Sequence, residues 1–161
     1  MELELRPPEP LGTTDDVSGF SCGEPVLDEW LKRRALVNQA SGASRTFVVK
    51  FKDGKVAGFY ALAAGAVALA AATGNVRRNM PDPIPVLVLG RLAVDRRAAG
   101  LQLGAALLKD AVVRATVVAE NAGVRALLVH ALHQKARDFY LKYGFQPYPV
   151  DHLTLMLRLA H

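Results

Sequence analysis

The sequence predicts an α/β fold of the layered α+β kind, with a mixed central β-sheet flanked by helices. Strand-like and helix-like patterns follow one another along the whole chain. The run 85–94 is apolar almost throughout, as expected of a central strand that is covered on both faces. A long amphipathic helix follows it and leads to another strand, as in a right-handed crossover. The chain has 161 residues, enough for a sizeable core, and we expect a single domain over residues 1–161.

The N-terminal part is predicted to form a strand, a helix and a β-hairpin. The helix covers 21–40, because Ser21 and Glu24 have capping-box spacing and Pro25 suits a first turn. Its apolar stripe consists of Val26, Leu27, Trp30, Leu31 and Leu36. Strands are expected at 3–7, 45–51 and 56–63. The sequence KDGK between the last two is a hairpin turn.

The C-terminal part is predicted to continue with a loop over 73–85 that holds at most a helical turn, and then with the central strand. The helix after it covers 100–123 and ends at Gly123. Its inner stripe consists of Gly104, Leu108, Ala111, Ala115 and Val118. The remaining elements are a strand at 125–132, a short helix closed by Gly144 and a strand at 153–159.

Composition favours a cytoplasmic protein without a membrane anchor. The single cysteine, Cys22, has no partner for an internal disulfide, which fits a reducing compartment. The acidic, proline-rich start is unlike a signal peptide. The uncharged run 56–72 is mostly alanine and glycine and is interpreted as a buried strand and its continuation. A net charge of +5 and a pI of 9.6 are compatible with a polyanionic partner, and equally with a solvated basic surface.

The junction of the central strand with the long helix, LGRLAVDRRAAGLQLGAALL, is the first candidate site. Free N–H groups and the positive end of the helix dipole converge at such a turn, which suits a phosphate or pyrophosphate. Gly100 and Gly104 allow close approach to the backbone, and Arg96 and Arg97 add positive charge. From these residues alone, a helix start with small residues for close packing explains the pattern equally well. No phosphate-binding P-loop, dinucleotide, serine-hydrolase or zinc motif is present in the sequence.

Together with ARDFYLKYGFQP, this junction resembles the GNAT acetyltransferase family. Three blocks narrow the resemblance: FSCGEPVLDEWLKRRALVNQASGASRTFVV, VLVLGRLAVD and LLVHAL…ARDFYLKYGF are similar to the GNAT toxins of bacterial toxin–antitoxin modules. The resemblance extends from about Phe20 to Pro147. It implies a GNAT domain that uses acetyl-CoA to acetylate the α-amine of aminoacyl-tRNA and so blocks translation. It also implies a ribbon-helix-helix antitoxin as partner, and a possible homodimer.

The resemblance assigns a role to particular residues. Tyr140 takes the place of the catalytic tyrosine, which donates a hydrogen bond or proton to the departing CoA sulfur. The implied cofactor-binding residues are Leu92, Ala93, Val94, Arg97, Ala99, Gly100, Leu101, Gln102, Leu103, Gly104 and Ala105. The family loop reads Gln/Arg–x–x–Gly–x–Gly/Ala, and this chain departs from it at Ala99 and Gln102. These two departures predict weakened acetyl-CoA binding, although most phosphate contacts come from backbone N–H groups.

Helical spacing separates the aromatic residues of the short helix. Ala136, Phe139 and Tyr143 fall on one stripe, so we expect Phe139 and Tyr143 in the core and Tyr140 facing a cleft. Core packing of all the aromatic residues is the structural alternative. A phenol with a pKa near 10 is a weaker acid than a thiol near 8.5, so full proton transfer costs about 2 kcal/mol, and a hydrogen bond to the sulfur is favoured.

The substrate predicted by these residues carries an α-amine. The central strand holds no carboxylate before Asp95 that would deprotonate a lysine, whereas an α-amine is partly neutral at pH 7. Glu29 and His130, the latter expected to be buried in its strand, remain possible auxiliary groups. The predicted tRNA contacts are Arg45, Arg77, Arg78 and Lys142, with Arg96, Lys109, Lys135 and Arg137 as further basic candidates.

Two other functions remain open at this point. One is a GNAT enzyme that acetylates a small amine or a protein N-terminus. The other is a degenerate GNAT fold that binds a protein partner without catalysis, which the altered loop residues Ala99 and Gln102 would permit.

Overall fold

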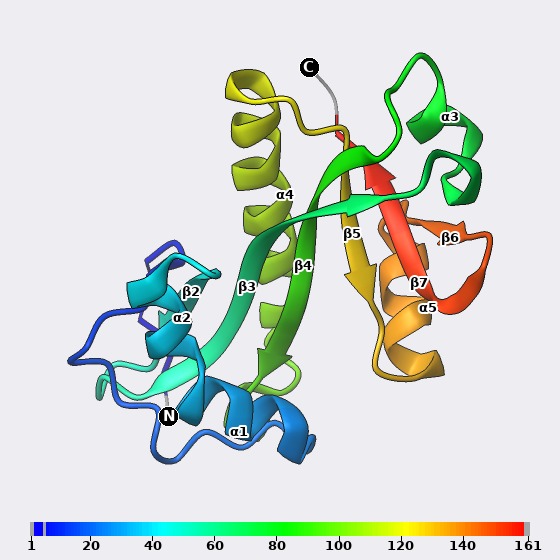
Figure 1. Cartoon of the computed structure of the whole chain (residues 1–161). Helices are drawn as coiled ribbons and strands as arrows, with labels where there is room; N and C mark the ends of the chain where they lie inside the picture. Colours follow the sequence, from blue (N-terminus) through cyan, green and yellow to red (C-terminus); the bar gives the residue numbers. More distant parts are fainter. Residues whose placement is uncertain (1, 5, 160–161) are drawn as a thin grey trace. The chain divides into compact units, whose positions relative to one another are not determined.

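The computed structural model describes residues 2–4 and 6–159 and has a mixed sheet with helices packed on it (Figure 1). The strands are β1 (Glu9–Pro10), β2 (Arg45–Lys50), β3 (Val56–Val67), β4 (Ile84–Val94), β5 (Ala126–His130), β6 (Gln146–Tyr148) and β7 (Asp151–Arg158). Their order in the sheet is β1-β2-β3-β4-β5-β7-β6. Strands β4 and β5 are parallel, while β2–β3 and β5–β7 are antiparallel. The predicted fold class is confirmed, and β4 is the central strand that the apolar run predicted.

The helices are α1 (Pro25–Arg33), α2 (Ala35–Ser41), α3 (Gly74–Arg77), α4 (Leu103–Asn121) and α5 (Gln134–Lys142), with short 3₁₀ turns η1 (Leu69–Ala71) and η2 (Arg96–Ala98). The chain forms two compact units. One consists of Met1–Ala63 and Arg91–Ala111, and the other of Ala64–Gly90 and Val112–His161. Strands β3 and β4 and helix α4 each run through both units.

The core of the first unit forms where α1 and α2 pack on β2 and β3. Phe59 is fully buried there, with Phe20 edge-on at 5.4 Å and Trp30 stacked at 6.0 Å between ring centroids. Gly58 on β3 lets the first turns of α4 approach closely, because a Cβ there would lie 2.9 Å from Leu107 Cδ1 and 3.0 Å from Leu103 Cδ2. The strand and the start of α4 are therefore held in tight contact.

The core of the second unit lies around β5 and β7. Ile84, Val86, Ala126, Leu128 and Met156 are buried together there. Arg125, which the sequence reasoning did not single out, hydrogen-bonds the main-chain oxygens of Asn75, Val76 and Arg78 at 3.1–3.2 Å. It therefore fixes the end of α3 to the start of β5.

The predicted N-terminal helix is wrong in its bounds and its cap. Residues 21–40 form two helices that meet at Arg34, and α1 begins at Pro25 with Glu24 as N-cap and no side-chain capping bond. Ser21 is not the cap, because α1 begins only at Pro25; its main-chain N–H donates instead to the Asp95 carboxylate at 3.0 Å. The next N–H, that of Cys22, donates to Asp28 on α1 at 2.9 Å. Val26, placed in the apolar stripe, is 65% exposed.

The short strand β6 was not predicted, and the other differences lie at the ends of elements. In place of the strand over 3–7, Leu3 makes an isolated bridge with Phe51, and the first strand is Glu9–Pro10; Leu5 lies outside the described residues. Pro7 and Pro8 have no N–H, so they cannot extend a ladder. Helix α4 starts at Leu103 rather than at 100 and ends at Asn121, before Gly123. Val118, placed on its inner stripe, is exposed, and Ala119 is buried instead.

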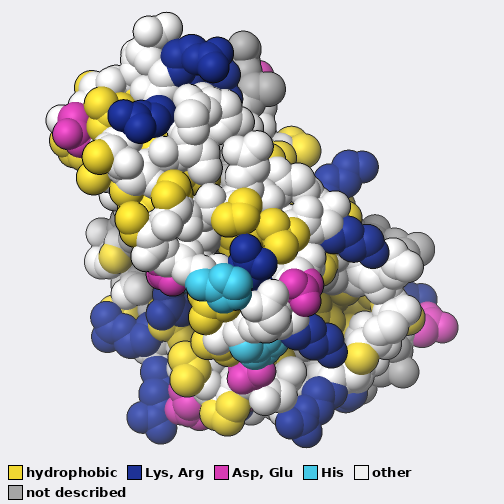
Figure 2. All heavy atoms as spheres, turned by 90° about the vertical axis from the view of Figure 1, so that its right-hand side faces the viewer, with side chains coloured by type: hydrophobic (Ala, Val, Ile, Leu, Met, Phe, Trp, Pro, Cys, Tyr) yellow, Lys and Arg dark blue, Asp and Glu magenta, His cyan; other side chains and the backbone are white. Residues whose placement is uncertain are grey.

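The surface carries basic side chains in many places. On the face in Figure 2, lysine and arginine side chains are spread out, with acidic and histidine side chains among them. No helix within 2–4 and 6–159 is long and apolar enough to cross a membrane.

Candidate acetyl-CoA site and catalytic tyrosine

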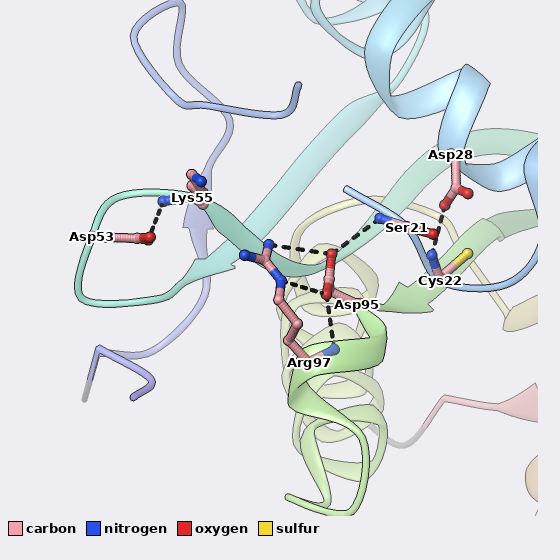
Figure 3. A network of polar contacts seen from close by, with 7 residues as sticks. All are labelled: Ser21, Cys22, Asp28, Asp53, Lys55, Asp95 and Arg97. Atoms are coloured by element: carbon pink, nitrogen blue, oxygen red, sulfur yellow. Dashed lines mark hydrogen bonds and ion pairs between the residues drawn. The ribbon is translucent and has the colours of Figure 1, made fainter. Parts of the chain in front are cut away.

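The turn after β4 is held by the buried carboxylate of Asp95, which is 2% exposed. Asp95 accepts hydrogen bonds from the N–H of Ser21 at 3.0 Å, and from the N–H and the Nε of Arg97 at 2.9 and 3.0 Å (Figure 3). Burial by itself raises the pKa of this carboxyl, but the hydrogen bonds from Arg97 and Ser21 outweigh burial and hold the pKa below its usual value. Asp95 is therefore ionised at neutral pH, and its oxygens are occupied by structural contacts.

Arg97, which is predicted to bind the cofactor, is also part of this hydrogen-bond network. Its guanidinium also lies over the ring of Phe51, 4.9 Å from the centroid. The positive charge predicted for cofactor binding is thus partly engaged within the protein. The cofactor role of Arg97 stays a prediction.

The loop between η2 and α4 bends through left-handed backbone. Gly100 has φ +81° and Gln102 has φ +58°. Glycine adopts this region freely, whereas a residue with a Cβ does so at a cost of roughly 1–2 kcal/mol. Gln102 thus keeps a conformation that the family's glycine would favour. Its side chain is exposed.

This bend leaves a cluster of N–H groups unused. Within the described residues, the N–H groups of Gly100, Gln102, Leu103, Gly104 and Ala105 donate to no main-chain or side-chain acceptor. They lie at the start of the long helix α4, where the helix dipole favours an anion. A pyrophosphate fits this donor set, because several N–H groups at one helix start can satisfy its oxygens.

The other predicted cofactor-binding residues lie in the end of β4, in this loop and in the first turn of α4. Leu92, Ala93 and Val94 lie in the last part of β4, beyond the Val86–Leu89 segment that pairs with β5. Ala93 is buried in the core of the first unit, and Leu92 and Val94 are half-buried. Ala99 and Leu101 are exposed, Leu103 is buried, and Gly104 and Ala105 are half-buried.

Tyr140 lies on α5 and is the buried aromatic residue of that helix. Its ring is 6% exposed and packs edge-on against Phe139 at 5.2 Å and Phe145 at 5.5 Å between centroids. Burial raises the pKa of Tyr140 well above its ordinary value. Among the described residues the Tyr140 hydroxyl has no hydrogen-bond partner. The side-chain oxygens that are both fully enclosed and unpartnered are those of Ser44 and Thr46, so the Tyr140 oxygen is not fully enclosed. The ring is therefore fixed while the hydroxyl reaches solvent.

The predicted division of the aromatic residues is wrong. Tyr143 is 41% exposed and Phe139 is half-buried, whereas Tyr140 was expected to be the less buried tyrosine. The stripe of α5 that carries Tyr140 is turned inward, rather than the stripe through Phe139 and Tyr143. Both stripes satisfy helical spacing, so only the packing of α5 on the sheet decides between them.

The auxiliary groups are placed differently from expectation. His130 is exposed rather than buried, since it ends β5, and its Nδ1 lies 3.0 Å from Thr154 Oγ1. Glu29 is exposed on α1 and pairs with Arg33 at 2.6 Å. The described part of the chain holds no group of His, Cys, Asp and Glu side chains suited to a metal ion.

The predicted tRNA contacts are all exposed. Arg45 belongs to the first unit, and its Nη1 donates to the main-chain oxygen of Gln39 at 2.6 Å. Arg77, Arg78 and Lys142 belong to the second unit, the first two at the end of α3 and Lys142 on α5, with its Nζ 5.7 Å from the Tyr143 ring centroid.

Comparison with known proteins places the chain among acetyltransferases. Residues 42–147 match the acetyltransferase (GNAT) domain. The chain is 55% identical over 150 residues to a tRNA-acetylating toxin of Mycobacterium tuberculosis, with 93% of this chain and 90% of that protein covered.

Two solved structures extend the comparison to complexes. AtaT complexed with acetyl-methionyl-tRNAfMet superposes with a TM-score of 0.87 at 27% identity, covering 98% of this chain and 95% of that one. A tyrosine-to-phenylalanine mutant of the AtaT toxin, bound to the C-terminus of the antitoxin AtaR and acetyl-CoA, superposes with a TM-score of 0.80 at 25% identity, covering 98% and 94%. The matched domain, the close sequence relative and the free N–H groups at the start of α4 agree, and the chain belongs to the GNAT acetyltransferase family.

Proposed function

We propose that this chain is an N-acetyltransferase toxin that transfers an acetyl group from acetyl-CoA to the α-amine of aminoacyl-tRNA, and so inhibits translation. The observation that carries the proposal is the 55% identity to a tRNA-acetylating toxin over almost the full length of both chains. The unused N–H groups at Gly100 and Gln102–Ala105 support it, since they suit the pyrophosphate of a CoA donor.

Acetyl-CoA supplies the acetyl group, which passes from sulfur to the substrate nitrogen as the C–S bond breaks and the C–N bond forms. The loop N–H groups hold the pyrophosphate, and the main chain at Leu92–Val94 donates to the acetyl oxygen as negative charge develops on it. The amine nitrogen releases one proton to solvent when the new bond forms, and the departing sulfur accepts a hydrogen bond from the protein.

Tyr140 provides that hydrogen bond in our proposal. Its raised pKa keeps the hydroxyl protonated at every physiological pH, so it is always available as a donor. The same shift makes full proton transfer to a thiolate still less favourable than for a free phenol. Tyr140 therefore stabilises the leaving sulfur by hydrogen bonding, and the thiolate takes its proton from solvent.

An α-amine substrate fits the groups available to this chain. Asp95 is committed to Arg97 and Ser21, so it does not serve as a general base. An α-amine with a pKa near 8 is partly neutral without help, whereas a lysine amine near 10.4 needs a base.

The remaining assignments belong to the same proposal. Arg45, Arg77, Arg78 and Lys142 contact tRNA phosphates, and the whole chain acts as one acetyltransferase domain in the cytoplasm. A cognate antitoxin of the ribbon-helix-helix type neutralises it, and the toxin forms a homodimer. Support for a protein antitoxin comes from the related AtaT toxin, which is bound to the C-terminus of AtaR.

The deciding experiment measures transfer of labelled acetyl from acetyl-CoA to total aminoacyl-tRNA, for wild type and Tyr140→Phe. Deacylated tRNA and amine-bearing peptides are the control acceptors. Label on charged tRNA alone, strongly reduced in Tyr140→Phe, supports the proposal. Label on peptides or small amines points instead to another GNAT substrate. Absence of both transfer and acetyl-CoA binding indicates a partner-binding module without catalysis.

A further inference from the structure

Arg91 on β4 occupies an unusual position for a cation. Its guanidinium carbon lies 4.6 Å from the centroid of the Trp30 ring. Trp30 in turn stacks on Phe59 at 6.0 Å with an interplanar angle of 11°, and Phe59 is fully buried. The three side chains belong to the same compact unit. The guanidinium therefore lies over an aromatic ring that is itself stacked on a buried one, so the cation is supported from one side.

This cation has no anionic partner of its own. Within the described residues, the Arg91 guanidinium makes no hydrogen bond and no ion pair. Arg97 has Asp95, and Arg33 on the neighbouring helix has Glu29 at 2.6 Å. Arg91 is half-buried, and this burial lowers its pKa with no carboxylate to offset it.

The donors of this half-buried guanidinium are not used by the protein and are available to a ligand. Its nitrogens are not among the enclosed, unpartnered atoms, so they remain accessible from solvent. Five N–H donors in a fixed plane match the paired oxygens of a phosphate or carboxylate. The arrangement is therefore a preformed anion site with one open side.

Its place along β4 indicates which anion it takes. Arg91 immediately precedes Leu92–Val94, and the strand rise puts it about 10 Å from Val94. The phosphates of the donor are assigned to the loop after Ala99, at the other end of this stretch. The acetyl end of the donor is uncharged, so the donor supplies no anion here, and the acceptor substrate is the molecule that the reaction brings to this end of β4.

We propose that Arg91 binds the phosphodiester that joins the last two nucleotides of aminoacyl-tRNA. This inference rests on the proposed function, and it makes Arg91 a substrate-binding residue that positions the aminoacyl end. The terminal phosphodiester is the anion nearest to the α-amine in every aminoacyl-tRNA, whatever the amino acid. An acidic amino-acid side chain or an acidic antitoxin segment has similar chemistry, and the test separates these sources.

The test compares two minimal acceptors that carry the amino acid accepted best in the total aminoacyl-tRNA assay. One is the aminoacyl-adenosine, which has no phosphate, and the other is the aminoacyl-cytidylyl-adenosine, which has one phosphodiester. Wild type is expected to acetylate the dinucleotide about 10- to 100-fold more efficiently, as measured by kcat/KM, the range of one charged hydrogen-bonded contact. Arg91→Gln is expected to lose this advantage, to act on the adenosine as wild type does, and to keep the KM for acetyl-CoA.

Control variants separate binding from folding. Arg91→Lys keeps the charge but not the planar fork, so its preference for the dinucleotide should be intermediate. Arg33→Gln removes an exposed cation on α1 and should leave the preference unchanged. Thermal unfolding of each variant checks that the stack on Trp30 still supports the fold.

Three results would overturn the inference. Equal loss on both acceptors means that Arg91 supports the structure or contacts the amino acid. Unchanged transfer to both acceptors with loss of antitoxin neutralisation means that the anion belongs to the antitoxin. If wild type transfers acetyl to no RNA acceptor at all, the proposed function fails and this inference fails with it. If wild type is active but Arg91→Gln lowers transfer to both acceptors equally, the inference alone fails.

Discussion

The Asp95 carboxylate accepts hydrogen bonds from both the main-chain N–H and the side-chain Nε of Arg97, at 2.9 and 3.0 Å. A residue two positions later thus locks the carboxylate in place, and the N–H of Ser21 binds the other oxygen. These contacts fix the backbone where β4 ends and η2 begins. The loop with the unused N–H groups starts from this anchor, so its geometry depends on the contacts of Asp95 with Arg97 and Ser21.

Asp95→Asn is expected to lower the free energy of unfolding by about 2 kcal/mol, the range of a buried hydrogen-bonded charge that is lost. An amide keeps the shape but has a single acceptor oxygen and no charge for Arg97. Urea unfolding followed by circular dichroism measures the change. Asp53→Asn, in the exposed hairpin turn, is the matched control and should change stability little. A loss at Asp95 no larger than at Asp53 would show that the network is not stabilising.

The same carboxylate makes stability depend on pH. The folded-state pKa of Asp95 is below its unfolded value, so the folded state binds fewer protons. Its contribution is fully present above the unfolded pKa near 3.9 and is lost as pH falls through the folded pKa. Wild type should therefore lose more stability than Asp95→Asn when the pH is lowered from 5 to about 3, in unfolding titrations at each pH. Parallel losses in the two proteins would contradict this assignment.

Gly58→Ala is expected to destabilise the protein by about 1–2 kcal/mol, because the new methyl group meets Leu107 and Leu103 on α4 and the Ala93 oxygen at 3.3 Å. The same displacement of the first turns of α4 should weaken acetyl-CoA binding. Gly90→Ala is the control, since nothing lies within 4 Å of a Cβ there. Unfolding in urea and calorimetric titration with acetyl-CoA give both readouts. Equal behaviour of the two variants would mean that α4 tolerates the added methyl group.

The parts of the site that depend on local sequence were predictable. The change from an apolar strand to small residues and then to a helix predicted the turn after β4 and the helix start that follows it. The partner of Ser21 was not predictable, because Asp95 is 74 positions away and only the packed fold brings it there. The burial of Tyr140 and the exposure of Tyr143, the reverse of the prediction, have the same kind of cause. Helical spacing allows either stripe of α5 to face inward, and the choice depends on the strand beneath it.

Substitutions of Gln102 test how strongly acetyl-CoA binding depends on the left-handed backbone of the loop. Gln102→Gly should keep or tighten acetyl-CoA binding, because glycine adopts φ near +58° without strain. Gln102→Val should weaken binding about tenfold, or about 1.4 kcal/mol, since a β-branched residue is disfavoured at positive φ more strongly than the unbranched glutamine. Isothermal titration with acetyl-CoA measures both affinities. The loop N–H groups are intact in both variants, so an equal effect of Gly and Val would show that the backbone conformation of Gln102 does not control donor binding.

The pH dependence of kcat/KM is expected to have one rising limb and no fall at high pH. The rate rises with a slope of one below about pH 8, because only the neutral α-amine attacks, and then levels off. Burial raises the pKa of Tyr140, so its hydroxyl stays protonated and the plateau extends to at least pH 10. Tyr140→Phe should lower the plateau about 10- to 100-fold without changing the shape of the curve. Tyr143→Phe, an exposed neighbour on the same segment, should leave the plateau unchanged. A descending limb near pH 9 that disappears in Tyr140→Phe would instead show that the tyrosine ionises in the working range, and that it transfers its proton to the sulfur.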